Sequence, residues 1–231
     1  MLGLLAASAA GFSMLYPEAA CADRWLPPET DTVMSRDGGY RLTIEPASFE
    51  GPATEGDHTT DRAVGVLERR NDADEWEPVW TANLLNPLAP VSALIADDGR
   101  HVVTLDNWGA VGRGDHVIAI YGEGGTVIRS YRLDDLLPPD YIAALSHSVS
   151  STAWRNEAAI SEADDRLVLD VHVPGDRYPS DSSDTVTFEI VLESGEIIAP
   201  PATQWARARC NAARVLEERS ETITVGQPHR P

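Results

Sequence analysis

Residues 91–133 constrain the fold more than any other part of the chain. They read as four strands joined by tight or glycine-rich turns: VSALIA-DDG-RHVVTLD-NWGAVGRGD-HVIAIY-GEGG-TVIRSYRL. Asp-Gly and Gly-Gly pairs supply the backbone angles that short hairpins require. The two middle runs, 101–105 and 116–121, are almost continuously apolar, which is typical of strands covered on both faces. This stretch therefore predicts a four-stranded antiparallel meander with a buried centre.

The flanking thirds of the chain repeat this pattern less regularly. We expect three units, at residues 31–83, 91–133 and 148–199, whose first hairpins turn at Asp37, Asp98 and Asp165. In the first unit, Pro78 cannot donate to a sheet ladder, so the fourth strand should be an edge strand. In the third unit, either residues 148–154 or residues 158–161 supply the first strand.

Each unit has the pattern of a β-propeller blade. The hairpin ADDGR at 96–100, followed by a buried strand, resembles propeller repeats of exported bacterial proteins. The DNW…GxGD stretch at 106–115 and the LLPxDY…SVSS stretch at 136–151 are similar to an uncharacterised family of such proteins. The resemblance implies blade-like repeats and brings no activity with it.

The predicted fold class is thus all-β, with three four-stranded antiparallel meanders that are partially propeller-like and a C-terminal α-helix. A β-sandwich is the alternative. Closed propellers use about four to eight blades, so three would leave a blade face uncovered. The C-terminal helix, the segment around Trp25 or a second subunit could cover it.

We predict that the β-repeat domain spans residues 23–200 and that the C-terminal helix spans 201–220, capped by Thr203. One face of this helix is apolar at helical spacing. Its residues are Trp205, Ala208, Ala212, Val215 and Leu216. Two short helical turns are expected between residues 134 and 145, the first capped by Asp134. Residues 221–231 should form a tail.

The first 22 residues have the pattern of a signal peptide. An apolar run from 2 to 16 precedes an A-x-A-like site at Ala20-Cys21-Ala22. The run is too short to span a membrane, and no basic residue precedes it, so a buried N-terminal helix is the alternative. We expect a periplasmic or extracellular protein in which Cys210, left alone after cleavage, could link two chains.

The charge balance excludes some partners. The formal net charge is −19, and all 18 basic residues are Arg. Nucleic acids and anionic lipid surfaces need a basic surface, so neither is an expected partner. An acidic surface favours solubility.

The loop at 106–116 is the most informative candidate site. Its candidate ligand-binding residues are Asp106, Asn107, Trp108, Arg113, Asp115 and His116. Glycines let a backbone approach a ligand closely, and Trp108 could serve as a stacking platform. Because the loop joins two strands and opens no helix, it lacks the context of a nucleotide-binding motif. A purely structural hairpin loop is the other interpretation.

Other chemical patterns are weaker. The run 146–151 contains Ser and His without a nucleophile elbow, and a structural turn explains it. Asp72 with Asp74, and Asp181 with Asp184, lack the full pattern of a calcium loop. We expect no metal and no cofactor. Trp76 and Trp80, four apart on a strand, should share a face, either as core or as a ligand platform.

These observations favour an exported, non-catalytic binding or scaffolding module for an unknown protein or small molecule. It could form a homodimer through an open blade or through Cys210. The alternative is a hydrolase at the central loop that uses two carboxylates and a histidine: Asp106, Asp115 and His116.

Overall fold

The structure is a computed structural model that describes residues 25–48, 62–175 and 184–225. It contains three four-stranded antiparallel sheets, each with its strands in chain order, and one two-stranded sheet. A long helix closes the described chain. The predicted all-β fold of three meanders with a C-terminal helix is therefore confirmed. We call the four-stranded sheets blades 1, 2 and 3.

The strands have the following bounds. Blade 1 contains β1 (Asp31–Met34), β2 (Tyr40–Glu45), β3 (Val64–Arg70) and β4 (Trp76–Asn83). Blade 2 contains β5 (Pro90–Ile95), β6 (Val102–Asn107), β7 (Ile118–Tyr121) and β8 (Val127–Tyr131), with the 3₁₀ turn η1 (Glu123–Gly125) before β8. Blade 3 contains β11 (Arg155–Ile160), β12 (Arg166–His172), β13 (Thr185–Val191) and β14 (Ile197–Ile198).

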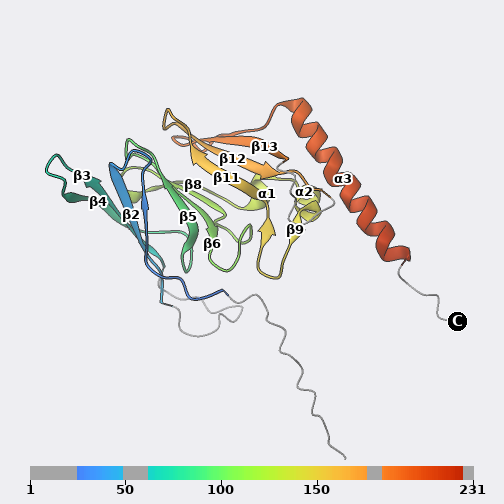
Figure 1. The fold of residues 1–231 in the computed structure, drawn as a ribbon, viewed down its shortest axis with the longest axis horizontal. Coiled ribbons are helices and arrows are strands. Elements are labelled where there is room, and N and C mark those ends of the chain that lie inside the picture. The colour runs from blue at the N-terminus through green and yellow to red at the C-terminus, as the bar shows by residue number, and fades with distance from the viewer. Residues whose placement is uncertain (1–24, 49–61, 176–183, 226–231) are drawn as a thin grey trace, which may run out of the picture.

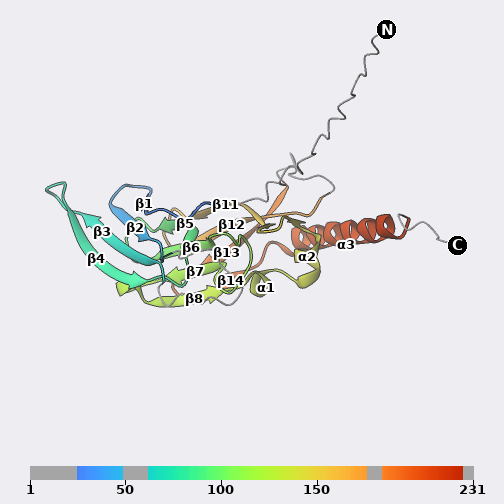
Figure 2. The same ribbon diagram turned by 90° about the horizontal axis from the view of Figure 1, so that it is seen from below.

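The three blades follow one another as an open array. The first strands gather together, since β1 and β11 both contact β5. Figures 1 and 2 show the β3–β4 hairpin at one end of the long axis and α3 (Ala202–Val225) at the other. This radial placement of first strands is the arrangement of propeller blades.

The first turn of each blade has the same geometry. The N–H groups of Gly38, Gly99 and Asp164 donate to carbonyls three residues earlier, at 3.0, 2.9 and 3.0 Å. All three residues have a positive φ, of 75°, 68° and 56°. A left-handed backbone favours glycine, and Asp is among the few other residues that tolerate it. The three blades therefore share the same backbone conformation at the equivalent residue of their first turn.

Two apolar cores lie between the blades. One joins blades 1 and 2 and includes Leu42, Leu67 and Tyr121; the other joins blades 2 and 3 and includes Leu105 and Phe188. Blade 2 is covered on both faces, so every residue of β6 and β7 is buried. This explains the continuous apolar runs of the two middle strands.

A β-bulge places Trp76 and Trp80 on opposite faces of blade 1. Leu67 pairs with Trp80, but the next residue, Glu68, pairs with Pro78, so Val79 is an extra residue in β4. Trp80 is buried, whereas Trp76 lies under the guanidinium of Arg41. The expectation that the two indoles share a face was wrong, because one inserted residue reverses the alternation of a strand. As Pro78 indicated, β4 is an edge strand.

The start of blade 3 also differs from expectation. Its first strand is β11, which shares residues 158–160 with the second predicted segment but begins three residues earlier, and the first predicted segment, 148–154, lies before it. Residues between α2 and β11 instead form a separate hairpin of β9 (Ser146–His147) and β10 (Thr152–Ala153). β11 is an edge strand with a register shift, and it begins with Arg, Asn and Glu. Its sequence therefore lacks the alternation of apolar and polar residues by which a strand is predicted.

The helices follow the predicted order with different caps. The N-cap residue of α1 (Leu133–Leu136) is Arg132 rather than Asp134, and the carboxylate of Asp135, inside the helix, accepts the Arg132 N–H at 2.8 Å. α2 (Pro139–Ala144) begins at a proline, which suits a first helical position. α3 begins at Ala202, so Thr203 lies inside it, and it continues to Val225.

α3 covers the end of the core between blades 2 and 3. Trp205 packs against Tyr141 of α2 and Phe188 of β13, with ring centroids 4.9 and 5.3 Å apart. The guanidinium of Arg219 donates to the carbonyls of Ala143 and Ala144, at 2.9 and 3.0 Å, where α2 ends. The predicted apolar face of the helix is thus the face that packs, and Ala208, Ala212 and Val215 are buried in it.

Several sequence predictions fall on other parts of the chain. The predicted signal peptide with Cys21, the final residues 226–231 and Asp181 lie outside the described residues. Within the described ranges, Cys210 is exposed and not in a disulfide. None of the helices described has the length and apolar character needed to cross a membrane.

Candidate functional site

Asp106 lies near the end of β6, where the candidate loop 106–116 begins. Its side chain is 1% exposed. Oδ1 accepts the Gly112 N–H and the Trp154 indole N–H, both at 2.8 Å, and Oδ2 accepts the guanidinium of Arg155 at 3.0 Å. A carboxylate whose oxygens are occupied in this way joins blade 2 to the start of blade 3. It is not available as a catalytic base.

Asn107 and Arg113 also make hydrogen bonds that stabilise the fold. The Asn107 amide accepts from Asn86 at 3.0 Å and donates to the Arg113 carbonyl at 2.9 Å. The Arg113 guanidinium donates to the carbonyls of Val149 and Ser148, at 2.6 and 2.7 Å. Because the β9–β10 hairpin has few sheet partners, these charge-assisted bonds hold it against blade 2.

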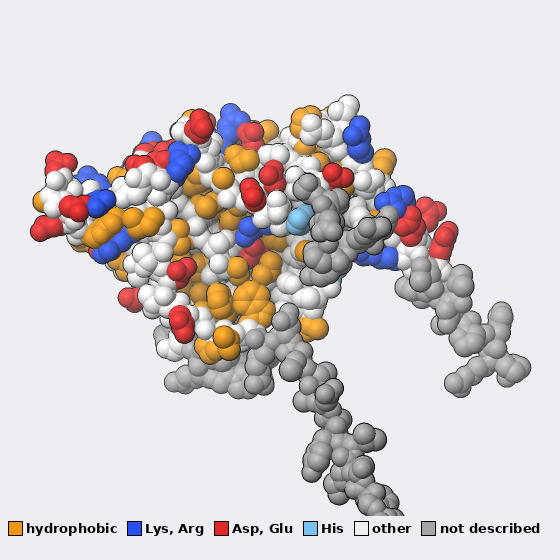
Figure 3. Space-filling view, viewed as in Figure 1, with side chains coloured by type: hydrophobic (Ala, Val, Ile, Leu, Met, Phe, Trp, Pro, Cys, Tyr) orange, Lys and Arg blue, Asp and Glu red, His pale blue; other side chains and the backbone are white. Residues whose placement is uncertain are grey.

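Trp108 is half-buried against the N-terminal segment. Its indole N–H donates to the Leu26 carbonyl at 2.9 Å, and its ring meets Trp25 edge to face with centroids 5.2 Å apart. Figure 3 shows hydrophobic side chains gathered beside the point where the described chain begins. Part of the predicted stacking platform is therefore already occupied by the protein itself.

Asp115 and His116 each contact a residue at the end of blade 2: Arg132 and Ser130, respectively. The Asp115 carboxylate is exposed and pairs with Arg132 at 3.0 Å. His116 Nδ1 lies 2.8 Å from the Ser130 hydroxyl, which also lies 3.5 Å from the Asp115 carbonyl. Burial of the imidazole, with the nearby charge of Arg62, lowers the pKa of His116 below its usual value of 6.5. His116 is therefore neutral at neutral pH.

Sequence reasoning missed Ser130. The signal that could have found it is the antiparallel pairing of β7 and β8, in which Ala119 lies opposite Ser130. That register brings the residues just before β7 to the end of β8. That register depends on a β-bulge between Ile120 and Tyr121, and no pattern in the sequence predicts this bulge.

A hollow of about 560 Å³ lies beside Ser130. It is formed by β8 together with one residue of α1 and one of β14: Val127, Ile128, Arg129, Ser130, Tyr131, Asp135 and Ile197. Its lining mixes three aliphatic side chains with one guanidinium, one carboxylate and the polar groups of Ser130 and Tyr131.

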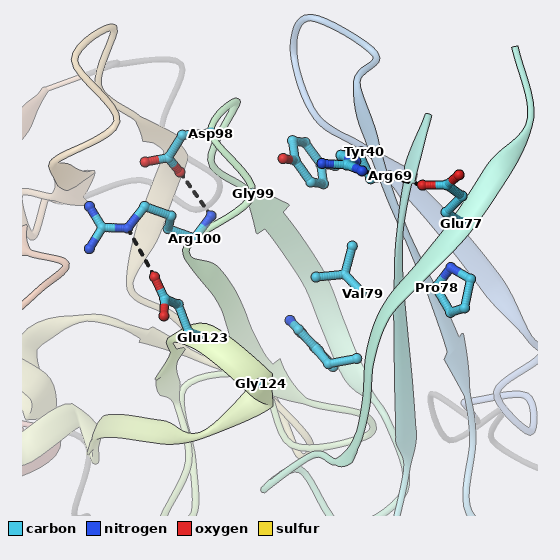
Figure 4. Close-up of a pocket in the computed structure, with 11 residues that line it drawn as sticks. Tyr40, Arg69, Glu77, Pro78, Val79, Asp98, Gly99, Arg100, Glu123 and Gly124 are labelled. Atoms are coloured by element: carbon cyan, nitrogen blue, oxygen red, sulfur yellow. Dashed lines mark hydrogen bonds and ion pairs between the residues drawn. The ribbon is translucent and has the colours of Figure 1, made fainter. Parts of the chain in front are cut away.

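A second cavity, of about 450 Å³, opens between blades 1 and 2 (Figure 4). Its walls carry two ion pairs, Arg69 with Glu77 and Arg100 with Glu123. None of the six predicted site residues lines it. Within the described part of the chain, His116 is the one of these six whose side chain contacts the hydroxyl of a potential nucleophile, Ser130. The other five make structural contacts within the protein.

No family model and no curated protein sequence matches this chain. Among solved structures it resembles the periplasmic gluconolactonase of Pseudomonas aeruginosa, with 10% sequence identity and a TM-score of 0.39. The likeness covers 75% of this chain and 45% of that one, so this chain spans less than half of its neighbour.

This comparison leads to one correction. The neighbour is an enzyme, and on this finding we withdraw the expectation of a non-catalytic binding or scaffolding module. A likeness this distant brings no activity, substrate or site to this chain. The resemblance to a family of exported bacterial proteins stays a prediction, since no family model matches.

Proposed function

We propose that the protein is a hydrolase of small carboxylic esters, with Ser130 as the nucleophile and His116 as the general base. The contact of 2.8 Å between His116 Nδ1 and Ser130 Oγ carries this proposal. A serine hydroxyl is a weak nucleophile until a neighbouring base takes its proton. A neutral imidazole at hydrogen-bond distance is the base that such a hydroxyl needs.

The proposed reaction has two halves. His116 takes the Ser130 proton while Oγ attacks the acyl carbon, and the imidazolium then protonates the departing alkoxide, leaving an acyl-serine. Water next attacks the acyl carbon as His116 takes its proton, and Ser130 regains a proton as the carboxylic acid leaves. The net change is one ester and one water converted into one acid and one alcohol.

The surroundings of Ser130 suit a short acyl chain. Val127 and Ile197 offer apolar surface in the adjoining hollow. β8 is the last strand of its sheet, and an edge strand presents main-chain N–H groups that the sheet does not use. Such donors are the kind that stabilise an oxyanion.

The experiment is the hydrolysis of p-nitrophenyl acetate and p-nitrophenyl butyrate by the purified chain. We expect Ser130→Ala and His116→Ala each to lower kcat about 10²-fold or more, because each removes one partner of the pair. Ser148→Ala is the matched control, since Ser148 also bonds a neighbour, Ser151, but lies in a structural turn. It should leave the rate unchanged.

The rate should also depend on pH in one direction. Because the pKa of His116 is lowered, the base is neutral and active at pH 7, and the rate should fall as pH drops below about 6.5. Absence of turnover above the buffer rate, or full activity in Ser130→Ala, contradicts the proposal.

We also propose that the protein is exported, as a periplasmic or extracellular protein. Support comes from the sequence of residues 1–22 alone. N-terminal sequencing of the chain expressed in a bacterium should give a first residue of Asp23. A chain that retains Met1 in the cytoplasm contradicts the proposal.

A further inference from the structure

The cleft between blades 1 and 2 is a cavity whose walls come from separate blades. Tyr40, Arg69 and residues 77–80 form the blade 1 wall, and residues 98–100 with Glu123 and Gly124 form the blade 2 wall. Figure 4 shows Tyr40, Arg69 and Glu77 on one side, and Arg100 on the other side with its side chain directed toward Glu123. The volume of about 450 Å³ is in the range of roughly 300–1,000 Å³ for small-molecule sites.

Each wall carries an ion pair that remains open to solvent. Arg69 and Glu77 lie 3.2 Å apart and are 56% and 51% exposed; Arg100 and Glu123 lie 3.5 Å apart and are 54% and 80% exposed. The second Glu77 oxygen accepts from Asn71 at 2.9 Å. These bonds hold the planar groups in place while leaving lone pairs and N–H groups for a ligand.

Between the ion pairs the lining is apolar. Trp80 is buried beneath the cleft, Pro78 is exposed in the blade 1 wall, and Val79 is 46% exposed there because it is the bulged residue of β4. The ring of Tyr40 lies against Gly99, where a Cβ atom would overlap it. The aromatic wall is therefore fixed by close packing between the blades.

The charge balance selects the class of ligand. Two guanidiniums and three carboxylates line the cleft. An anion would meet the carboxylates, a cation would meet the guanidiniums, and a purely apolar molecule would strip water from both ion pairs at a cost. A neutral molecule rich in hydroxyl groups can donate to the carboxylates and accept from the guanidiniums at once.

We propose that this cleft binds a neutral saccharide of one or two sugar units. The hydroxyl groups bond the two ion pairs, and an apolar ring face lies on Tyr40 and Val79. This site goes beyond the proposed hydrolase, since none of its lining residues borders the hollow at Ser130. The two proposals can therefore fail separately.

The test is a titration of the full chain with glucose, maltose and cellobiose, followed by tryptophan fluorescence and by calorimetry. We expect saturable binding of at least one of these sugars. Arg69→Ala and Glu123→Gln should each weaken it about tenfold, because each removes a charge-assisted hydrogen bond. Inorganic phosphate and spermidine should not compete.

The adjacent Arg70 gives a matched control. It is on the same strand as Arg69 and pairs with Asp74, but it does not line the cleft. Arg70→Ala should leave the sugar affinity within about twofold. Absence of binding by all three sugars, competition by phosphate or spermidine, or equal losses in Arg69→Ala and Arg70→Ala each overturn the proposal.

Discussion

At the scale of single residues, buried charge explains the central loop better than ligand binding does. Asp106 is the one residue of the predicted site whose carboxylate is fully enclosed, and its φ of 60° is unusual for a residue other than glycine. Its three donor groups come from Gly112, Trp154 and Arg155. The favourable bonds offset both the strain of the backbone and the desolvation of the charge.

We expect Asp106→Asn to lower the free energy of unfolding by about 3–5 kcal/mol, because it leaves the guanidinium of Arg155, only 16% exposed, without its counter-ion. Urea denaturation would measure this. Asp115→Asn, in the same loop but at an exposed ion pair, should cost less than about 1 kcal/mol. Equal costs for the two variants would show that the Asp106 contacts do not stabilise the junction.

At the scale of elements, the first turns of the three blades connect the sheets as well as reversing the chain. The Asp97 carboxylate accepts from the Arg36 guanidinium at 2.5 Å and from the Asp37 N–H at 3.0 Å. Arg36 also lies 3.8 Å from Asp164. One arginine of the first turn thus reaches acidic groups of the other two turns, which links the first hairpins of the three blades.

Gly38 and Gly99 occupy equivalent positions in these turns and share a positive φ, of 75° and 68°. Replacing either with Ala should cost about 1–2 kcal/mol of unfolding free energy through backbone strain. A Cβ atom at Gly38 meets nothing, whereas one at Gly99 overlaps the ring of Tyr40. Thermal unfolding should therefore show the larger loss for Gly99→Ala, and equal losses would mean that Tyr40 moves aside freely.

At the scale of the whole molecule, an array of three blades needs covers for its ends. The outward face of blade 1 carries the Arg41–Glu68 ion pair, and that of blade 3 carries the Arg166–Glu189 ion pair. Polar outer faces are what terminal repeats need to remain in water. α3 does not cover either of these faces; it closes the side of the core that blade 3 shares with blade 2.

Trp205→Ala tests how much α3 contributes. The indole packs on Tyr141 and Phe188, so its removal should cost about 2 kcal/mol or more, although less than a fully buried Trp because Trp205 is half-buried. Chemical denaturation followed by circular dichroism would report the loss. Arg209→Ala, on the exposed side of the helix, should change stability by less than about 0.5 kcal/mol. Similar values for both variants would mean that α3 is only loosely attached.

Much of the architecture could be predicted from the sequence. The three meanders, the buried middle strands of blade 2 and the apolar face of α3 all follow from turn residues and from apolar spacing. These are local properties, because a residue's neighbours along the chain decide whether a hairpin or a helix forms.

The candidate site was decided by the tertiary structure. Asp106 meets its partners across 48 and 49 residues of sequence, and Trp108 reaches Leu26 across 82. A bulge turned Trp76 away from Trp80, and another set the register that brings Ser130 to the end of β8 beside His116. Such pairings depend on how sheets pack and on where single residues are inserted, and neither leaves a periodic signal in the chain.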